Sequence, residues 1–372
     1  MKVTIERAAL LRSLGHVQSV VERRNTIPIL SNVKLEAEDG QLALTATDLD
    51  LAVVATVPCD VQSKGSITAP AHTLYDIVRK LPEGAQVELA LGKSEGRLTL
   101  RSGRSEFALA CLPVEDFPVM AEGELPTRFE LASAELRRLI DNTRFAISTE
   151  ETRYYLNGVY LHATTEDKKA VLRAVATDGH RLARIETAAP GGSAKMPGVI
   201  VPRKVIAEIR KLIDETEGAV AVALSQTKIR FGVGDTVLTS KLIDGTFPDY
   251  QRVIPAGNDK MLGVDGRTLA AAVDRVSTIT TDKLRAVKLA LERDRLTVSA
   301  TSPDQGSATE ELAVAYQGGA IQIGFNARYL LDILSQIKGE EARFAFADAT
   351  SPVIARDSED AGALYVLMPM RV

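Results

Sequence analysis

The residues best suited to chemistry in this sequence are Asp178 and His180, which are separated by one glycine and followed by Arg181. An aspartate two residues from a histidine could act as an acid–base pair or supply two metal ligands. A metal site needs three or four ligands, however, and the other histidines have no ligand spacing: His16, His72 and His162. We therefore expect Asp178 to shape a turn, and we expect no catalytic residue and no bound metal.

Other signatures of enzymes are missing from the sequence. There is no GxxxxGK[ST] phosphate-binding loop and no GxSxG nucleophile elbow, and the glycine pairs at 191–192 and 318–319 precede no phosphate-binding helix. The two cysteines, Cys59 and Cys111, are too few for a disulfide framework and lie in strand-like patterns. We expect both to be small core residues of a protein from a reducing compartment. The sequence thus predicts a non-catalytic protein without a cofactor.

The composition is that of a globular protein. The chain has 372 residues, of which 45% are hydrophobic and 25% charged, enough for two or three hydrophobic cores. No apolar run approaches 18 residues, and Glu6 and Arg7 fall where a secretory signal would need an apolar segment. We expect a cytoplasmic protein with no membrane partner.

An internal repeat organises the positions of these residues. A helical pattern followed by strand-like segments begins near residues 6, 132 and 265, and Asp178 lies 130 residues after Asp48 in a second ATD sequence. Each unit then contains a second helical pattern that follows Pro70, Pro202 or Asn326. The prolines suit the first turn of a helix, and Asn326 can cap the third helix. The predicted helices cover residues 7–24, 71–80, 134–144, 203–213, 266–285 and 327–338.

The repeat predicts both the domains and the fold class. Three domains are expected at 1–121, 128–255 and 262–372, joined by segments rich in proline, glycine and polar residues. The strand-like segments alternate between apolar and polar residues, and each helix carries one apolar stripe. We therefore expect an α+β fold in which each domain packs two helices on antiparallel sheets.

The charge is segregated along the chain. The whole sequence carries a net charge of −4, yet the six helical windows contain 19 basic and 8 acidic side chains, a net charge of +11. Helices on one side of the sheets would form a positive surface suited to a polyanion bound through its phosphates. With 5% aromatic residues and no tryptophan, a duplex fits better than a single strand. For any one helix, the alternative is an ordinary solvated basic face.

Several motifs resemble one known family. RYYLNG (153–158), VATDGHRLA (175–183), VPRK (201–204), SKLIDGTFPDY (240–250) and the terminal MPMRV are similar to the bacterial DNA polymerase III beta subunit family, the replicative sliding clamps. The similarity extends from the opening MKVTIER to the last residue, in the same order.

The resemblance implies a DNA-clamp fold that dimerises head-to-tail into a closed ring around double-stranded DNA, without sequence specificity. Two helices per domain would line the hole. The implied DNA-lining candidates are Arg24, Arg79, Lys80, Arg137, Arg138, Arg144, Arg203, Lys204, Arg210, Lys211, Arg275 and Lys283. The ring would have no reaction of its own and would need no cofactor. It would be loaded by an ATP-driven clamp loader and would tether the DNA polymerase III alpha subunit, other polymerases and repair proteins.

The family binds its partners through a short peptide with glutamine, leucine and phenylalanine anchors. Carried onto this chain, the peptide-binding pocket consists of Arg153, Leu156, Thr177, Gly179, His180, Arg181, Leu182, Pro248, Arg252, Val253, Asn326, Tyr329, Val366, Leu367, Met368, Pro369, Met370 and Arg371. Its aliphatic and methionine side chains would form an adaptable apolar cleft. His180, Arg181 and Arg371 are expected to form hydrogen bonds with the peptide.

The implied dimer interface departs from the family pattern. Glu106 replaces a basic residue, and the facing segment GSAT (306–309) has lost acidic residues, leaving Glu310 among the few. The interface candidates are Arg104, Glu106, Phe107, Ile279 and Glu310. We expect Phe107 and Ile279 to provide apolar closure with fewer ion pairs.

Two other functions remain to be weighed against this one. An enzyme would use Asp178 and His180, and a ring-shaped scaffold would use the peptide pocket without binding DNA. The basic helices argue against the scaffold, and the missing ligands and motifs argue against the enzyme.

Overall fold

The structure is a computed structural model that describes residues 1–92, 96–121, 123–280 and 285–371. The chain divides into two compact units. Unit 1 comprises Met1–Leu136, Pro190–Met196 and Lys204–Leu242, and unit 2 comprises Arg137–Ala189, Pro197–Arg203 and Ile243–Val372.

Unit 1 contains two antiparallel sheets. The five-stranded sheet has the order β5 (Asp60–Ser63), β1 (Lys2–Glu6), β7 (Gln86–Leu91), β8 (Arg97–Ser102), β9 (Ser105–Ala110). The eight-stranded sheet has the order β10 (Thr127–Ala132), β15 (Ala219–Leu224), β16 (Lys228–Val233), β17 (Thr236–Lys241), β4 (Leu51–Pro58), β3 (Gln41–Thr47), β2 (Asn32–Glu38), β6 (Gly65–Pro70). The short 3-10 helices η1 (Pro28–Ser31) and η2 (Val114–Asp116) lie in the connections.

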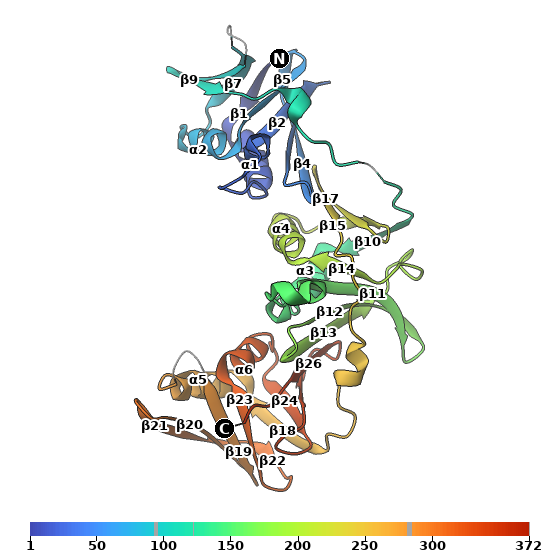
Figure 1. The fold of residues 1–372 in the computed structure, drawn as a ribbon, viewed down its shortest axis with the longest axis vertical. Coiled ribbons are helices and arrows are strands. Elements are labelled where there is room, and N and C mark those ends of the chain that lie inside the picture. Colours follow the sequence, from blue (N-terminus) through green and yellow to red (C-terminus); the bar gives the residue numbers. More distant parts are fainter. Residues whose placement is uncertain (93–95, 122, 281–284, 372) are drawn as a thin grey trace. The chain divides into compact units, whose positions relative to one another are not determined.

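Helices α1 (Arg7–Gln18) and α2 (Ala71–Lys80) pack against each other, and α1 also packs on β3 and β4 (Figure 1). The apolar stripe of α1 places Leu10, Leu14 and Val17 in the core. The carboxylate of Glu6 caps this helix by accepting a hydrogen bond from the N–H of Ala9 at 3.0 Å. The third helix of unit 1 is α4 (Arg203–Ile213), which belongs to the unit from Lys204 onwards.

Unit 2 also contains two antiparallel sheets. The nine-stranded sheet has the order β14 (Val199–Pro202), β11 (Gly158–Glu166), β12 (Lys169–Thr177), β13 (Arg181–Ala188), β26 (Ala363–Leu367), β25 (Val353–Asp357), β24 (Glu341–Phe346), β18 (Lys260–Asp265), β22 (Ala315–Tyr316). The four-stranded sheet has the order β21 (Gly306–Ala313), β20 (Arg295–Ser302), β19 (Ala286–Glu292), β23 (Ile321–Asn326).

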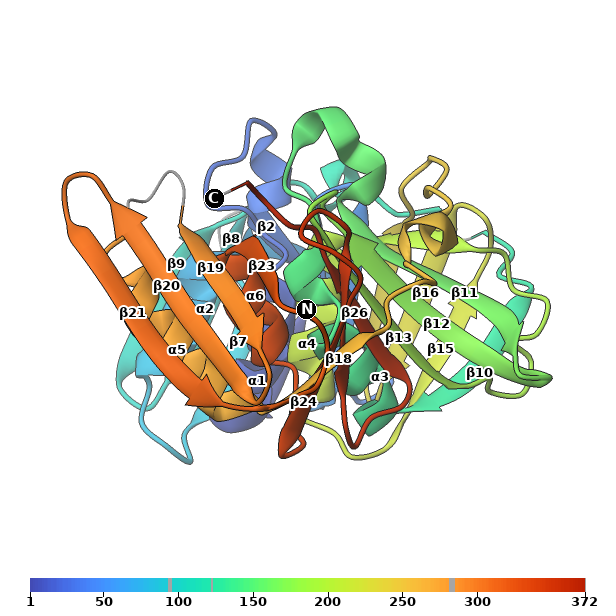
Figure 2. The same ribbon diagram turned by 90° about the horizontal axis from the view of Figure 1, so that it is seen from below.

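Helices α5 (Gly266–Ser277) and α6 (Ala327–Leu334) pack together in unit 2, and α5 also contacts β20 and β21. Figure 2 shows β19, β20 and β21 side by side with α5 against them. Helix α3 (Ser133–Asp141) belongs to unit 2 from Arg137 onwards, and the connections contain η3 (Arg144–Ala146), η4 (Glu151–Leu156) and η5 (Tyr250–Val253).

The predicted α+β class is confirmed, because every strand pairing in the described ranges is antiparallel and the helices pack on the sheets. Two of the strand pairings join strands that are distant in the sequence, and these two pairings resemble each other. In unit 1, β4 pairs with β17, matching Leu51 with Ser240; in unit 2, β13 pairs with β26, matching Arg181 with Leu367. Each pairing begins after a turn that contains an ATD aspartate, Asp48 or Asp178.

The helix boundaries were predicted correctly at 71–80 and 203–213, but four predicted helices were wrong at their ends. Windows 7–24, 266–285 and 327–338 end early, at Gln18, Ser277 and Leu334, and window 134–144 is replaced by 133–141. After Gln18, the N–H groups of Val20 and Val21 bond only three residues back, so the α-helix stops although both valines are buried. At the end of α5, the hydroxyls of Ser277 and Thr278 both donate to the carbonyl oxygen of Asp274, which competes with helix continuation.

Three smaller predictions were also tested. Asn326 does cap α6, because its Oδ1 accepts hydrogen bonds from the N–H groups of Arg328 and Tyr329 at 3.0 and 3.4 Å. Pro70 and Pro202, expected in the first helical turn, instead end the preceding strands β6 and β14. The prediction of core cysteines was wrong: Cys59 and Cys111 are half-buried and lie just after β4 and β9, where the side chains leave the sheet core.

No helix in the described part of the chain is long and apolar enough to span a membrane.

Candidate functional site

Asp178 shapes the turn between β12 and β13. Its Oδ1 accepts hydrogen bonds from the N–H groups of His180 and Arg181 at 2.9 and 3.0 Å. Gly179 has a φ of +89°, which favours glycine, and a Cβ there would lie 2.7 Å from Nη1 of Arg153. The turn interpretation of Asp178 is therefore confirmed, and the positive φ at position 179 explains why a glycine is favoured there.

Arg181 is the buried centre of the site, with 8% of the residue exposed. Its guanidinium lies between the rings of Phe145 and Tyr329, 5.1 and 4.4 Å from their centroids. Nε donates to Asp178 at 3.1 Å, Nη2 donates to the carbonyl oxygen of Phe145 at 2.6 Å, and Nη1 donates to Asp332. These bonds hold η3, the β12–β13 turn and α6 together, so Arg181 positions the walls of the site from within.

The walls above Arg181 are aromatic and apolar. The rings of His180 and Tyr329 are stacked with their centroids 6.0 Å apart, and burial raises the pKa of the Tyr329 hydroxyl. The carboxy-terminal segment forms the next wall. It is fixed by hydrogen bonds from Met368 N–H to the carbonyl oxygen of His180 and from Met370 N–H to that of Gly324, both 2.9 Å.

The floor of the site is a hydrophobic cluster. Strand pairing matches Leu182 with Val366, and both are buried in a cluster completed by Leu156, Val175, Ile200, Phe247, Tyr250 and Leu364. Val253 and Met368 are exposed large apolar residues of the same unit. The cluster therefore supports the site from within, and Val253 and Met368 are apolar side chains of the same unit that remain accessible to a partner.

A buried polar network supports this floor, and the sequence did not predict it. The side chain of Arg173 is 2% exposed; its Nε donates to Glu186 at 2.7 Å, and its Nη groups donate to Glu166 and, at 3.4 Å, to the Tyr250 hydroxyl. Although burial opposes the charge, these hydrogen bonds raise the pKa of Arg173. The Tyr250 oxygen also lies 3.0 Å from Nε2 of His162, whose pKa is lowered mainly by burial.

Stacked rings extend from this network. The ring of Tyr160 lies between those of His162 and Phe247, with centroid distances of 4.7 and 4.8 Å. Tyr160 and His162 alternate with buried residues along β11 and therefore share one face of the sheet. That alternation was the one signal in the sequence that could have placed them together.

All eighteen predicted pocket residues belong to unit 2. Arg153 lies in η4 and pairs with Glu150 at 3.3 Å, and Arg252 lies in η5 and pairs with Asp249 at 2.9 Å. The side-chain oxygen of Asn326 is used by the α6 cap described above, and Arg371 is exposed.

The basic candidates of unit 1 differ in how far acidic groups compensate them. Lys204 pairs with Asp48 at 2.5 Å and with Glu22 at 3.3 Å. Although burial disfavours the charged form of Lys204, these two contacts raise its pKa. The other pairs are Arg79 with Asp76, Lys211 with Glu208 and Arg210 with Asp214. Arg24 and Lys80 are exposed. Arg24 follows α1 rather than lying on it, because the helix ends at Gln18.

The basic candidates of unit 2 show the same division. Arg138 pairs with Asp360 and donates to the carbonyl oxygen of Glu186 at 2.9 Å, while Arg275 forms two hydrogen bonds with Glu310 at 3.0 and 2.5 Å. Arg144 lies in η3, beyond the end of α3, and pairs with Asp141 at 3.2 Å. Arg137 is half-buried and Arg203 is exposed, whereas Lys283 lies outside the described residues.

Four of the five predicted dimer-interface residues lie on an edge strand or in the turn next to one. Glu106 and Phe107 are on β9, the last strand of the five-stranded sheet, with Arg104 in the turn before it. Glu106 pairs across the hairpin with Arg101 at 3.2 Å. Glu310 is on β21, the last strand of the four-stranded sheet of unit 2, and Ile279 follows α5.

No group of three or more histidine, cysteine, aspartate or glutamate side chains in the described ranges could hold a metal ion. The site geometry thus consists of an apolar floor, stacked aromatic walls and hydrogen-bonding groups.

Three family models match consecutive parts of the chain. They describe the N-terminal, central and C-terminal domains of the DNA polymerase III beta subunit and match residues 1–121, 130–249 and 251–371. The beta sliding clamp of Caulobacter vibrioides is 56% identical over 372 residues, and that of Escherichia coli K12 is 41% identical over 374 residues, each with complete coverage of both chains.

Solved structures agree with these matches. The Caulobacter crescentus beta sliding clamp with PEG bound superposes with a TM-score of 0.98 at 56% identity, covering 100% of this chain and 99% of that one. The Bartonella birtlesii sliding clamp bound to griselimycin superposes with a TM-score of 0.97 at 51% identity, with full coverage of both chains. With three domains of the beta clamp fold, this chain belongs to the DNA polymerase III beta subunit family, the non-catalytic sliding clamps that make that polymerase processive.

Proposed function

We propose that two copies of this chain form a head-to-tail ring that encircles duplex DNA and tethers DNA polymerase III through its alpha subunit. The clamp loader, other polymerases and repair proteins would use the same site. The proposed domains are residues 1–121, 128–255 and 262–372, and the proposed location is the cytoplasm, at replication forks. The ring would act by raising the concentration of its partners at the DNA, not by any reaction of its own.

The observation that carries this proposal is the site around Arg181. Its apolar floor at Leu182 and Val366 suits the leucine and phenylalanine anchors of a partner peptide. The exposed imidazole of His180 and the exposed guanidinium of Arg371 are the proposed hydrogen-bond donors to the peptide. Arg181 has three N–H groups bound to the chain's own oxygens, and we propose it as a positioning residue.

Two strand edges support ring closure. In the described ranges, β9 pairs only with β8, and β21 pairs only with β20. An exposed strand edge is a template for pairing with another chain, and a head-to-tail dimer would join β9 of one subunit to β21 of the next. A closed ring would leave neither edge free.

The test of the proposed function is retention on DNA of different topology. After incubation with a clamp loader and ATP, the protein should co-elute with nicked circular DNA in gel filtration and should be lost once the same DNA is linearised. Equal retention on both DNAs would mean ordinary electrostatic binding and would contradict the ring mechanism. Retention on neither would favour a scaffold that does not bind DNA.

The first prediction concerns the dimer interface. Phe107→Arg should convert the dimer to a monomer of 40.1 kDa, because a charged side chain would replace the half-buried apolar group at the β9 edge. Multi-angle light scattering would measure the mass. Ile27→Arg is the matched control, since Ile27 is an exposed apolar residue elsewhere in unit 1. A variant at Phe107 that remains dimeric would relocate the interface.

The second prediction concerns the DNA-lining surface and uses exposed basic residues that form no ion pair within the described part of the chain. Reversing the charge of Arg24, Lys80 and Arg203 together should shorten processive synthesis several-fold and leave the dimer intact, because phosphate contacts are lost. Product length on primed circular DNA is the measurement. The control reverses three basic residues outside the predicted helices, Lys64, Lys168 and Lys195. Equal effects of both triple changes would contradict a specific DNA-lining surface.

A further inference from the structure

We propose that unit 1 contains a second peptide-binding groove, at the pairing of β4 with β17, for an extended peptide with apolar anchors and a carboxylate. The inference about its ligand rests on the proposed peptide site of unit 2, because the two sites are built from equivalent strands. The groove itself rests on the cavities, registers and charges of unit 1.

The equivalence begins at the two ATD turns. Asp48 Oδ1 accepts hydrogen bonds from the N–H groups of Asp50 and Leu51 at 3.0 and 2.7 Å. Asp178 Oδ1 likewise accepts from the N–H groups of the residues two and three positions after it. The residue after each aspartate has a positive φ, +80° at Leu49 and +89° at Gly179. The two turns therefore deliver β4 and β13 to their partner strands in the same way.

The strand registers are equivalent as well. In unit 2, Leu182 of β13 lies opposite Val366, and Arg184 lies opposite Leu364. The residues 130 positions earlier in the sequence are Ala52 and Val54 of β4. In unit 1 they lie opposite Thr239 and Val237. Phe117-Pro118 likewise precedes Phe247-Pro248 by 130 positions. The β4–β17 pairing thus presents the positions that form the floor of the proposed peptide site.

Those positions in unit 1 line a cavity of about 410 Å³. Thr47, Ala52, Val54, Pro118, Val237 and Thr239 contribute to its lining. Alanine and threonine stand where unit 2 has Leu182 and Val366, so the floor here carries less side-chain volume and less apolar area. We therefore expect a weaker site than that of unit 2.

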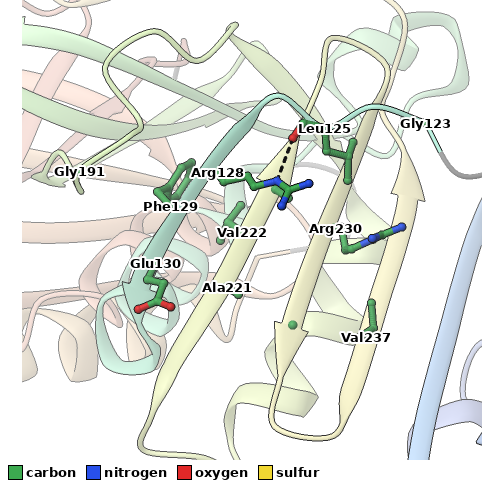
Figure 3. A pocket seen from close by; sticks show the side chains of 12 residues that line it. Gly123, Leu125, Arg128, Phe129, Glu130, Gly191, Ala221, Val222, Arg230 and Val237 are labelled. Atoms are coloured by element: carbon green, nitrogen blue, oxygen red, sulfur yellow. Dashed lines mark hydrogen bonds between the residues drawn. The ribbon is translucent and has the colours of Figure 1, made fainter.

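A second cavity, of about 670 Å³, extends the groove across the sheet. The two cavities share Arg230 and Val237. Figure 3 shows the side chains of Arg230 and Val237 on neighbouring strands, with Leu125 of the segment before β10 nearby. Ala221 and Gly232 lie opposite each other on β15 and β16 and leave room for a backbone along the sheet surface. An extended segment is the shape that this combined groove fits.

Three basic side chains and one acidic side chain line the combined groove: Arg128, Arg230, Lys34 and Glu130. On balance these charges favour an acidic segment. Nε of Arg230 donates to Thr239 Oγ1 at 3.3 Å, and Nε of Arg128 donates to the carbonyl oxygen of Leu125 at 3.3 Å, the bond drawn in Figure 3. Among the described residues, neither guanidinium has a carboxylate within ion-pair distance, whereas Lys34 at the other end pairs with Glu36 at 2.9 Å. A carboxylate on the ligand could form charge-assisted hydrogen bonds with the guanidinium of Arg230.

The rim provides apolar contacts. Val119 is 84% exposed and Met120 is half-buried, and both line the smaller cavity. A methionine beside an exposed valine can adapt to different anchor side chains. An amphipathic peptide would cover these two residues and pair with Arg230 in the same binding event.

The test uses a fluorescein-labelled synthetic peptide that contains one glutamine, two leucines, one phenylalanine and two flanking glutamates. Binding is followed by fluorescence anisotropy with the full chain and with a chain that lacks Met368–Val372, which removes the tail wall of the proposed site in unit 2. The shortened chain should keep saturable binding of one peptide per chain. Val54→Glu in that chain should weaken this binding at least tenfold, because it fills the floor and pairs with Arg230.

Two further variants separate the groove from a general effect on the sheet. Arg230→Glu should weaken binding to the shortened chain at least fivefold. Ala43→Glu should not, because Ala43 is half-buried on the neighbouring strand β3 but does not line the cavity. No saturable binding to the shortened chain, or equal weakening by Val54→Glu and Ala43→Glu, would overturn the second groove. If the full chain and the shortened chain bind the peptide equally well, that result would contradict the proposed site of unit 2 but not the groove of unit 1.

Discussion

Replacing Arg173 with methionine will lower the free energy of unfolding by about 3–5 kcal/mol, the usual cost of removing one partner from a buried ion pair. The side chain is 2% exposed and bonds to two glutamates and to the Tyr250 hydroxyl. Methionine replaces the aliphatic part of the arginine but leaves Glu186, which is 15% exposed, without its partner. Because Tyr250 belongs to the floor of the peptide site, peptide affinity should fall as well.

The measurement is the shift of the first thermal transition by calorimetry, since a chain with several domains need not unfold in one step. Arg343→Met is the matched control. Arg343 also lies on a strand of unit 2 and pairs with a glutamate, Glu341, at 2.7 Å, but its side chain is 54% exposed. An exposed pair contributes about 0–1 kcal/mol. A shift at Arg173 no larger than that at Arg343 would contradict a structural role for the buried network.

Deleting Met368–Val372 and replacing His180 with alanine will weaken binding of a partner peptide to unit 2 by at least ~100-fold, about 2.8 kcal/mol. The deletion removes the tail wall and the exposed Arg371, and the alanine removes the ring that stacks on Tyr329. Such central side chains provide most of the binding energy of an interface. Binding that remains should be the weaker binding assigned to the groove of unit 1.

This prediction is measured by fluorescence anisotropy together with light scattering, because the dimer should remain intact. Asp167→Ala is the control substitution, at an exposed turn residue between β11 and β12. Unchanged affinity in the double variant with an intact dimer would show that the peptide binds elsewhere on the chain.

Local signals in the sequence predicted the antiparallel α+β class and both ends of the helices at 71–80 and 203–213. They failed where the hydrophobic pattern continued past a helix. Val20 and Val21 fit the apolar stripe of α1, yet their N–H groups bond only three residues back. At the end of α5, Ser277 and Thr278 form side-chain bonds to the backbone that compete with helix continuation.

The turn at Asp178 could be predicted because all its bonds are local. The role of Arg181 could not, since it depends on Phe145 and Asp332, which are 36 and 151 residues away in the sequence. Arg173 was hidden for a similar reason. A lone arginine within the apolar strand β12 shows no sign of the two glutamates and the tyrosine that neutralise and bind it in the folded chain.

The eight-stranded sheet has a consequence for proteolysis and hydrogen exchange. Its β4–β17 ladder runs from Thr236 opposite Ala55 to Ser240 opposite Leu51, so strands from distant parts of the sequence share one set of backbone hydrogen bonds. A protease that cuts the segment between Phe117 and Thr127 would therefore leave two fragments held together without a covalent link. The amides of β4 and β17 that bond to each other should share one opening free energy in hydrogen exchange, because breaking this ladder exposes both strands.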